Sequence, residues 1–300
     1  MNNGGAQACP PIPLKPQSPA ILLLTDRSSN TTNADGQGRN WWKGENDAIN
    51  AALDAAPSSV KFGYRPFPVN PGCGGGDSWN DTWMGMVGDR ITACMTGSCV
   101  SQSPEIPLSS VVDNVGRNDT SLQGLGDKWK PWLVVLLGTP PSCGVNACQS
   151  VATSLTNLSR YSRMSEAIVP FGGIAASDCL DNLQAITSSV APSKTAQTSD
   201  ELKTNLVETI TGIVAQTQCT FVSGAFAQSN NVDSLRVQIG GPSGTTLPDL
   251  TNSGATKAWA DDGYSFEILG GACRTISEAL AKGQTVSVVA FLSSSCRGNP

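Results

Sequence analysis

Residues 20–24, Ala-Ile-Leu-Leu-Leu, constrain the fold of this chain more than any other stretch, because polar residues follow them almost at once. A short continuous apolar run bounded by polar residues is typical of a strand buried on both faces, as in a parallel sheet. The carboxyl ends of such strands are where open α/β sheets bind ligands. The run therefore predicts an α/β fold with its working face near residue 26.

Three oxygen-bearing side chains, Asp26, Ser28 and Asn30, follow this strand at alternating positions. One carboxylate and two neutral oxygens suit a hard divalent cation such as Mg²⁺, Mn²⁺ or Ca²⁺. The alternative is structural, because Asp and Ser side chains readily hydrogen-bond nearby backbone amides. The pattern is compatible with a metal site and with a loop held only by side-chain caps.

The composition indicates a globular chain of one large domain or two smaller ones. Of its 300 residues, 39% are hydrophobic and only 14% are charged, which is unlike a disordered protein. The net charge of −5 has the wrong sign for a nucleic-acid-binding surface. No stretch reaches the ~18 apolar residues of a membrane span, so no transmembrane segment is expected.

Cysteine usage predicts an oxidising compartment. The chain has ten cysteines and no histidine, and two close pairs stand out, Cys94/Cys99 and Cys143/Cys148. Up to five disulfides in an extracytoplasmic protein, secreted or at the cell surface, fit this count better than ten free thiols in the cytosol. The polar N-terminus lacks a signal-peptide core, so we expect the export signal to be missing from this chain.

Strand and helix patterns alternate through residue 217, which predicts a doubly wound, mostly parallel sheet flanked by helices. Residues 1–18 are rich in proline and are expected to be an extended N-terminal segment. The expected strands of the α/β domain are 20–25, 60–67, 132–137 and 167–171, and the expected helices are 41–56, 108–115, 147–163, 180–190 and 199–217.

From residue 219 the pattern changes to short strands with Gly- and Ser-rich turns. The predicted division is therefore 1–18, an α/β domain at 19–218, and a small β-rich C-terminal module at 219–300. Within the module we expect strands at 219–222, 234–239, 264–269 and 285–292 and a helix at 274–282. Cys219 and Cys296 are an attractive disulfide pair, although Cys273 could replace either partner.

The segment Asp26-Arg27-Ser28-Ser29-Asn30 resembles the D-x-S-x-S signature of von Willebrand factor type A (integrin I-like) domains, which carry a metal-ion-dependent adhesion site (MIDAS). The stretches 136–143, 168–173, 270–273 and 291–296 are similar to a cysteine-rich, secreted bacterial branch of that family. The resemblance covers about residues 18–297 and implies a metal-binding cell-adhesion domain followed by a β module.

The resemblance implies a set of metal ligands, which must be carried over residue by residue. The first loop supplies Asp26, Ser28 and Asn30, where Asn30 departs from the pattern. The second loop supplies Thr120, with Asp119 as a possible compensating charge. The third-loop aspartate is absent, because Gly138 stands there, or Thr139 with a one-residue slip, and losing a carboxylate weakens a hard-cation site.

These observations favour an extracytoplasmic binding or adhesion protein that engages a protein ligand through the sheet edge, with a divalent cation completing the contact. The alternative is a structural or assembly subunit of a surface complex, in contact with neighbouring subunits, whose metal site no longer functions. An enzyme is not expected: without histidine, Ser-His-Asp and Cys-His catalysis are excluded.

Overall fold

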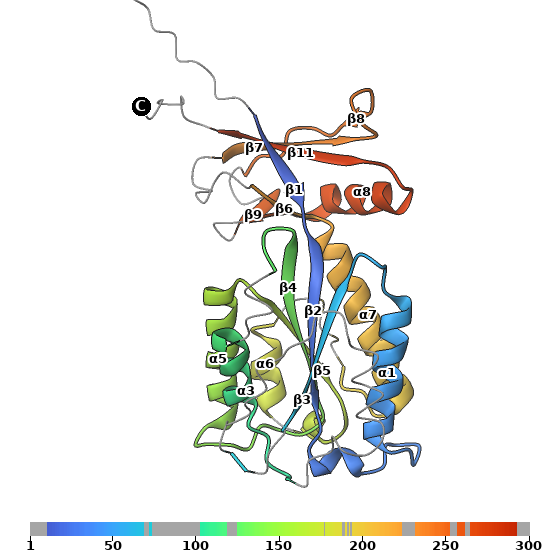
Figure 1. Ribbon diagram of the computed structural model, residues 1–300, viewed down its shortest axis with the longest axis vertical. Coiled ribbons are helices and arrows are strands. Elements are labelled where there is room, and N and C mark those ends of the chain that lie inside the picture. Colours follow the sequence, from blue (N-terminus) through green and yellow to red (C-terminus); the bar gives the residue numbers. More distant parts are fainter. Residues whose placement is uncertain are drawn as a thin grey trace, which may run out of the picture. The chain divides into compact units, whose positions relative to one another are not determined.

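The computed structural model describes residues 11–68, 72–73, 103–118, 125–176, 178–187, 190, 192, 194–223, 232–252, 257–261 and 265–292. The chain forms two compact units (Figure 1). One unit is Pro19–Val214, and the other combines Met1–Ser18 with Ala215–Pro300. Each unit has its own sheet and its own hydrophobic core. The protein is therefore a mixed α/β protein.

The unit Pro19–Val214 is built on a four-stranded sheet with the order β3-β2-β4-β5. Strand β2 pairs in parallel with β3, from Ala20↔Lys61 to Asp26↔Phe67, and β4 pairs in parallel with β5. The bounds are Ser18–Asp26 for β2, Lys61–Phe67 for β3, Trp129–Leu137 for β4 and Ser165–Pro170 for β5. The prediction of a buried strand near residues 20–25 is confirmed, because residues 20–24 have no exposed surface.

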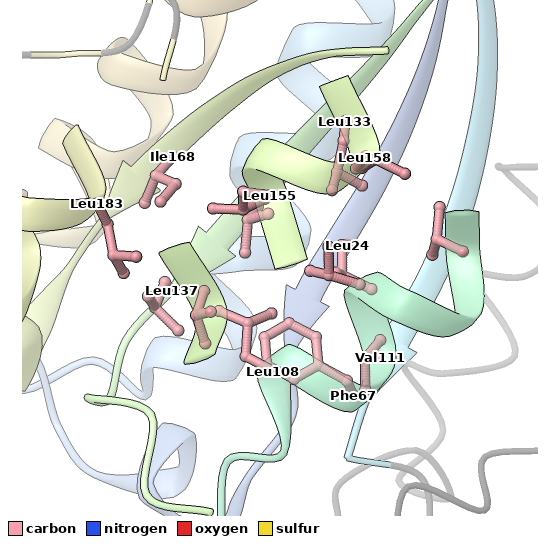
Figure 2. Close-up of a cluster of buried hydrophobic side chains, with 14 of the residues drawn as sticks. Leu24, Phe67, Leu108, Val111, Leu133, Leu137, Leu155, Leu158, Ile168 and Leu183 are labelled. Carbon is pink, nitrogen blue, oxygen red and sulfur yellow. The ribbon is translucent and has the colours of Figure 1, made fainter. Parts of the chain in front are cut away.

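Helices cover both faces of this sheet. Successive side chains of a strand point to opposite faces. Ile21 and Leu23 pack with α1 (Trp41–Ala55) and α7 (Ser199–Thr217), whereas Leu22 and Leu24 pack on the other face, which is shown in Figure 2. That second face is covered by α3 (Leu108–Asn118), α5 (Ala147–Ser162) and α6 (Asp178–Gln184).

The predicted helices are found with small shifts at their ends. Helix α1 begins after Asn40, whose side-chain oxygen accepts a hydrogen bond from Trp42 N at 2.9 Å, an N-cap that satisfies an otherwise free amide. Helix α6 ends at Gln184, earlier than the predicted end at residue 190. Two 3₁₀ helices were not predicted from the sequence: η1 (Ser29–Thr32) and η3 (Gly172–Ala176).

The second unit contains the larger sheet of the described chain, and it is antiparallel, so the expectation of a mostly parallel sheet holds only for Pro19–Val214. Its seven strands have the order β8-β7-β11-β1-β6-β10-β9, and α8 packs in its core. The bounds are Ile12–Pro16 (β1), Thr220–Val222 (β6), Val232–Ile239 (β7), Thr245–Thr246 (β8), Trp259–Asp261 (β9), Ser265–Ile268 (β10), Gly270–Ala281 (α8) and Val286–Leu292 (β11).

The Pro-rich N-terminal segment contributes a strand rather than a separate lead-in. Residues 12–14 of β1 pair with β11, and residues 15–16 pair with β6. Proline has no amide hydrogen and tolerates only the edge of a sheet. Each of these two parts of β1 has a partner strand on one side. Pro13 and Pro16 can therefore lie in the strand although they have no amide hydrogen to donate on the other side. The predicted domain bounds at residues 18 and 218 remain a prediction.

Three disulfides join the described cysteines, none of which is free: Cys73–Cys143, Cys148–Cys179 and Cys219–Cys273. The preferred pair Cys219–Cys296 was wrong, and Cys273 is the partner of Cys219. The reason is topological: Ile268 N donates to Cys219 O at 2.9 Å, which brings the following helix α8 beside β6. Cys9, Cys94, Cys99 and Cys296 lie outside the described residues.

Among the described helices, none has the length and apolar character needed to cross a bilayer.

Candidate binding cavity at the carboxyl edge of the parallel sheet

The ends of three strands meet at one edge of the four-stranded sheet. Gly138 N, just after β4, donates to Asp26 Oδ2 at the end of β2, at 3.2 Å. Phe171 N, just after β5, donates to Leu137 O at 3.0 Å. The chain leaves β2 toward β3 on one side and returns as β4 on the other side. The strand order thus runs outward in one direction from β2 to β3 and in the opposite direction from β4 to β5. The carboxyl ends of β2 and β4 therefore mark the topological switch point, where open α/β sheets bind ligands.

Asp26 fastens the loop after β2 to the end of β4. Its carboxylate is fully buried. Oδ1 accepts a hydrogen bond from Ser28 N at 2.9 Å, and Oδ2 accepts the bond from Gly138 N. Burial raises the pKa of Asp26, while the bonds from Ser28 and Gly138 act in the opposite direction. Both carboxylate oxygens are thus engaged by backbone amides.

Ser28 and Asn30 lie in the same loop, in different environments. Ser28 is fully buried, and its carbonyl oxygen accepts bonds from Thr31 N and Oγ1. The Ser28 hydroxyl itself has no hydrogen-bond partner of good geometry. Asn30 is half-buried and donates from Nδ2 to Pro104 O at 3.4 Å. Thr120 and Asp119 lie outside the described residues, so the complete ligand set remains a prediction.

A side chain at Gly138, where the resemblance implies an aspartate, would meet an aromatic ring. A Cβ atom on Gly138 would lie 2.6 Å from Phe171 Cζ. Phe171 is 1% exposed and packs against Trp41 with ring centroids 5.0 Å apart, so it cannot easily move aside. Within the described ranges, no group of three His, Cys, Asp or Glu residues could hold a metal. With one carboxylate, already bonded to amides, the described donors do not fit a stable hard-cation site.

A cavity of about 480 Å³ opens at this edge. Its walls come from the loop after β2, the ends of β4 and β5, and the segment before α7. The lining residues are Asn30, Thr31, Asn33, Ala34, Asp35, Gly36, Trp41, Gly138, Thr139, Phe171, Gly172, Gly173 and Gln197. Asn30 is the one predicted metal ligand, among those described, that lines it.

Asp35 ties one wall of the cavity to the start of α7. Its Oδ2 accepts from Ser199 N at 2.8 Å and from Ser199 Oγ at 2.6 Å, and its Oδ1 accepts from the amides of Gln37 and Arg39. Although burial acts to raise it, these four bonds hold the pKa of Asp35 well below its usual range. Gly44 allows this approach, because a Cβ there would lie 2.7 Å from Ser199 Cβ.

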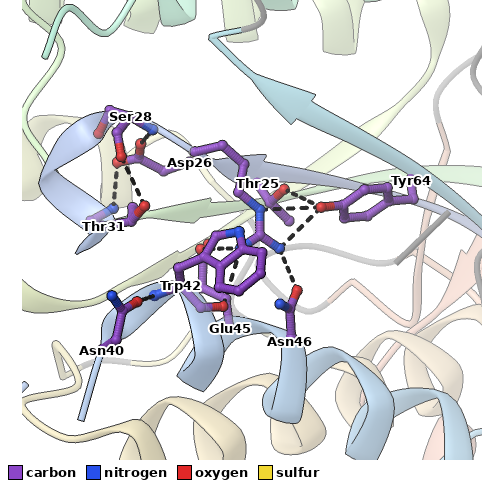
Figure 3. Close-up of polar contacts among 11 residues, drawn as sticks. Thr25, Asp26, Ser28, Thr31, Asn40, Trp42, Glu45, Asn46 and Tyr64 are labelled. Carbon is purple, nitrogen blue, oxygen red and sulfur yellow. Dashed lines mark hydrogen bonds and ion pairs between the residues drawn. The ribbon is translucent and has the colours of Figure 1, made fainter. Parts of the chain in front are cut away.

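Arg27, in the loop that follows β2, forms a buried ion pair with Glu45. Figure 3 labels Glu45 together with Asn46 and Tyr64, which also contact the arginine. Arg27 Nη1 lies 3.1 Å from Glu45 Oε2 of α1, and both side chains have no exposed surface. The guanidinium also donates to Asn46 Oδ1 at 2.7 Å and to Tyr64 OH at 3.0 and 3.2 Å. Burial raises the pKa of Glu45 well above its usual range, against the attraction of Arg27. The cluster joins β2, β3 and α1.

Sequence reasoning missed both Asp35 and the Arg27–Glu45 pair. The available signal for the pair was Arg27 itself, a charged residue within the motif that follows a fully buried strand. The signal for Asp35 was weaker, because its partner Ser199 lies 164 positions away.

No protein-family model matches the sequence, and no curated protein matches it. Solved structures resemble the chain at low identity, and three of them illustrate the match. Proximal thread matrix protein 1 from the mussel byssus is 12% identical, with 69% of this chain and 50% of that chain covered and a TM-score of 0.46.

A von Willebrand factor type A protein from Catenulispora acidiphila is 10% identical (92% and 57% covered, TM-score 0.47). The pilus adhesin SpaC from Lactobacillus rhamnosus GG, in its open conformation, is 13% identical (95% and 41% covered, TM-score 0.49). The chain thus spans about half the length of the solved proteins it matches. TM-scores below 0.5 do not establish a shared fold.

Proposed function

We propose that this chain is an extracytoplasmic binding protein that engages its ligand through the cavity at the carboxyl edge of the parallel sheet. The observation that carries this proposal is the position of the cavity. It lies at the switch point between β2 and β4, where the strand ends and the loops that follow them converge. A cavity of about 480 Å³ is within the size range of small-ligand sites, roughly 300–1,000 Å³.

The domain is proposed to be a doubly wound sheet of the von Willebrand A type. Helices on both faces and the Asp-x-Ser-x-Asn loop after the first strand of the parallel sheet support this assignment. The three disulfides support an oxidising compartment, secreted or at the cell surface. Its partner is a protein ligand or a neighbouring surface subunit that presents a group to the cavity.

The proposal is tested by mapping where small molecules bind. A fragment library is screened by ¹H–¹⁵N NMR, and the shifted amides are assigned. We expect the hits to cluster at Gly36, Thr139, Gly173 and Gln197, which line the cavity. The variant Gly173→Trp fills the cavity and should abolish these shifts, while its circular dichroism shows that it folds. Hits that lie elsewhere, or that persist in Gly173→Trp, would contradict the proposal.

A second candidate is cation-assisted binding at the same edge. Asp26, Ser28 and Asn30 would hold the cation, with Thr120 or Asp119 completing the ligand set. The observation that favours it is the placement of the buried Ser28 hydroxyl beside the buried Asp26 carboxylate, two oxygen ligands of the kind a hard cation takes. A cation that binds the folded state must raise its stability. A thermal titration with Mg²⁺, Mn²⁺ and Ca²⁺ therefore separates the two candidates.

A further inference from the structure

We propose that the cavity binds an uncharged sugar residue. This inference rests on the proposed function, because it names the ligand class of the same cavity. It follows from three properties of the lining residues: their charge, their hydrogen-bonding groups and the glycine backbone along one wall.

The first property is the lack of an available charge. Asp35 is the only charged residue among the lining residues described, and it lies buried. Its two oxygens already accept bonds from Gln37, Arg39 and Ser199. The Asp35 charge is also balanced by Arg39, whose Nε lies 3.7 Å from Oδ2. A charged ligand group that enters the cavity would therefore lose water without gaining an unpaired opposite charge, which costs several kcal/mol. The site therefore selects a neutral ligand.

The second property is a set of neutral hydrogen-bonding side chains. Asn30, Asn33, Thr139 and Gln197 line the cavity. Amide side chains both donate and accept hydrogen bonds, and a hydroxyl does the same. Sugar hydroxyls have the matching double character. In Asn30, the amide nitrogen donates to Pro104 O, so its carbonyl oxygen is the group suited to accept from a ligand.

The third property is a wall of glycine backbone in front of two buried aromatic rings. Trp41 and Phe171 pack at 5.0 Å with their planes tilted by 44°, and both line the cavity. Gly138, Gly172 and Gly173 lie beside them and contribute no side chains. Trp41 and Phe171 are only 6% and 1% exposed, so the two rings back this wall and do not themselves stack on a ligand. The glycines leave room for a compact ring, and the neutral amides can bond its hydroxyls. A whole protein partner needs ~800 Å² on each side, so this cavity suits one displayed group.

The test combines a glycan array with calorimetry on the full chain. Array hits are followed with methyl glycosides of neutral hexoses and of N-acetylglucosamine, and with glucuronate as a charged comparison. We expect a neutral sugar to bind and glucuronate to bind at least tenfold more weakly. Gln197→Ala and Asn33→Ala should weaken binding about tenfold, the effect of one lost hydrogen bond. Gln149→Ala, an exposed glutamine outside the cavity, is the matched control and should not change it.

Two results would overturn the inference. One is an array without a neutral-sugar hit, and the other is binding that survives in Gly173→Trp. If fragments still map to the cavity while no neutral sugar binds, the sugar assignment fails and the proposed binding site stands. If the fragments also miss the cavity, the proposed function fails as well.

Discussion

Two carboxylates of the parallel-sheet unit, Asp35 at the cavity and Glu166 at the start of β5, have similarly small exposed surfaces. Their exposed fractions are 8% and 5%, yet their pKa values move in opposite directions. Four hydrogen bonds lower the pKa of Asp35 although burial opposes them. Burial raises the pKa of Glu166 to about 8 against the attraction of Lys130 and a backbone hydrogen bond, and its Oε1 has no hydrogen-bond partner. Glu166 lies deeper in the protein than Asp35 and has fewer donors, so depth and donors together separate the two pKa values.

Glu45 is a third buried carboxylate, and its partner is the guanidinium of Arg27. We expect Arg27→Met to cost about 3–5 kcal/mol in the free energy of unfolding, since it leaves Glu45 buried without its partner. Urea denaturation at pH 7 measures the loss. Arg39→Met, at a side chain that is 41% exposed, is the control and should cost about 1 kcal/mol or less. A loss below that of the control would show that Glu45 is neutral in the folded protein.

The donors around Asp35 predict the next largest effect. Asp35→Ala removes the acceptor of four bonds and should lower the free energy of unfolding by about 3 kcal/mol at pH 7. Because the folded-state pKa of Asp35 is lowered, its stabilisation is present above the unfolded pKa of 3.8 and is lost as pH falls below it. The difference between wild type and variant should therefore shrink below pH 4. Asp47→Ala, at an exposed position of α1, is the control.

Glu166 should behave in the opposite way. Its folded-state pKa is raised, so its contribution to stability is full below the unfolded pKa of 4.5 and is lost as pH rises through about 8. We expect Glu166→Gln to raise the free energy of unfolding by about 2 kcal/mol at pH 9 and by little at pH 5. Glu208→Gln, on the exposed face of α7, should have no such pH dependence. An equal effect at both pH values would refute the role of the buried charge.

Asp26 accepts hydrogen bonds from two amides, fewer than Asp35 and more than Glu166. The smallest effect is expected at this residue. Millimolar Mg²⁺, Mn²⁺ or Ca²⁺ should shift the melting temperature of the wild type by less than about 1 °C, because both carboxylate oxygens already accept amide bonds. Asp26→Asn is the control. A cation-dependent rise in the wild type that is absent from Asp26→Asn would favour the cation-assisted candidate.

Much of the parallel-sheet unit could be predicted from the sequence, because its signals are local. Residues 20–24 are apolar in succession, and helices 41–56 and 199–217 have caps and apolar faces that can be recognised within a few turns. The antiparallel unit was less predictable. Strand β1 pairs with β11 across more than 270 positions, and no local pattern carries that information.

The sequence by itself determined that a buried strand ends in Asp26, that polar side chains follow it, and that the cysteines suit an oxidising compartment. Only the tertiary structure decided that Phe171 fills the space beside Gly138, that Arg27 pairs with Glu45, and that Asp35 bonds Ser199. The physical reason is that a strand or a helix follows from the spacing of apolar residues over a short stretch of sequence. A site forms only when the packing of the whole unit brings side chains that are distant in the sequence within hydrogen-bonding distance.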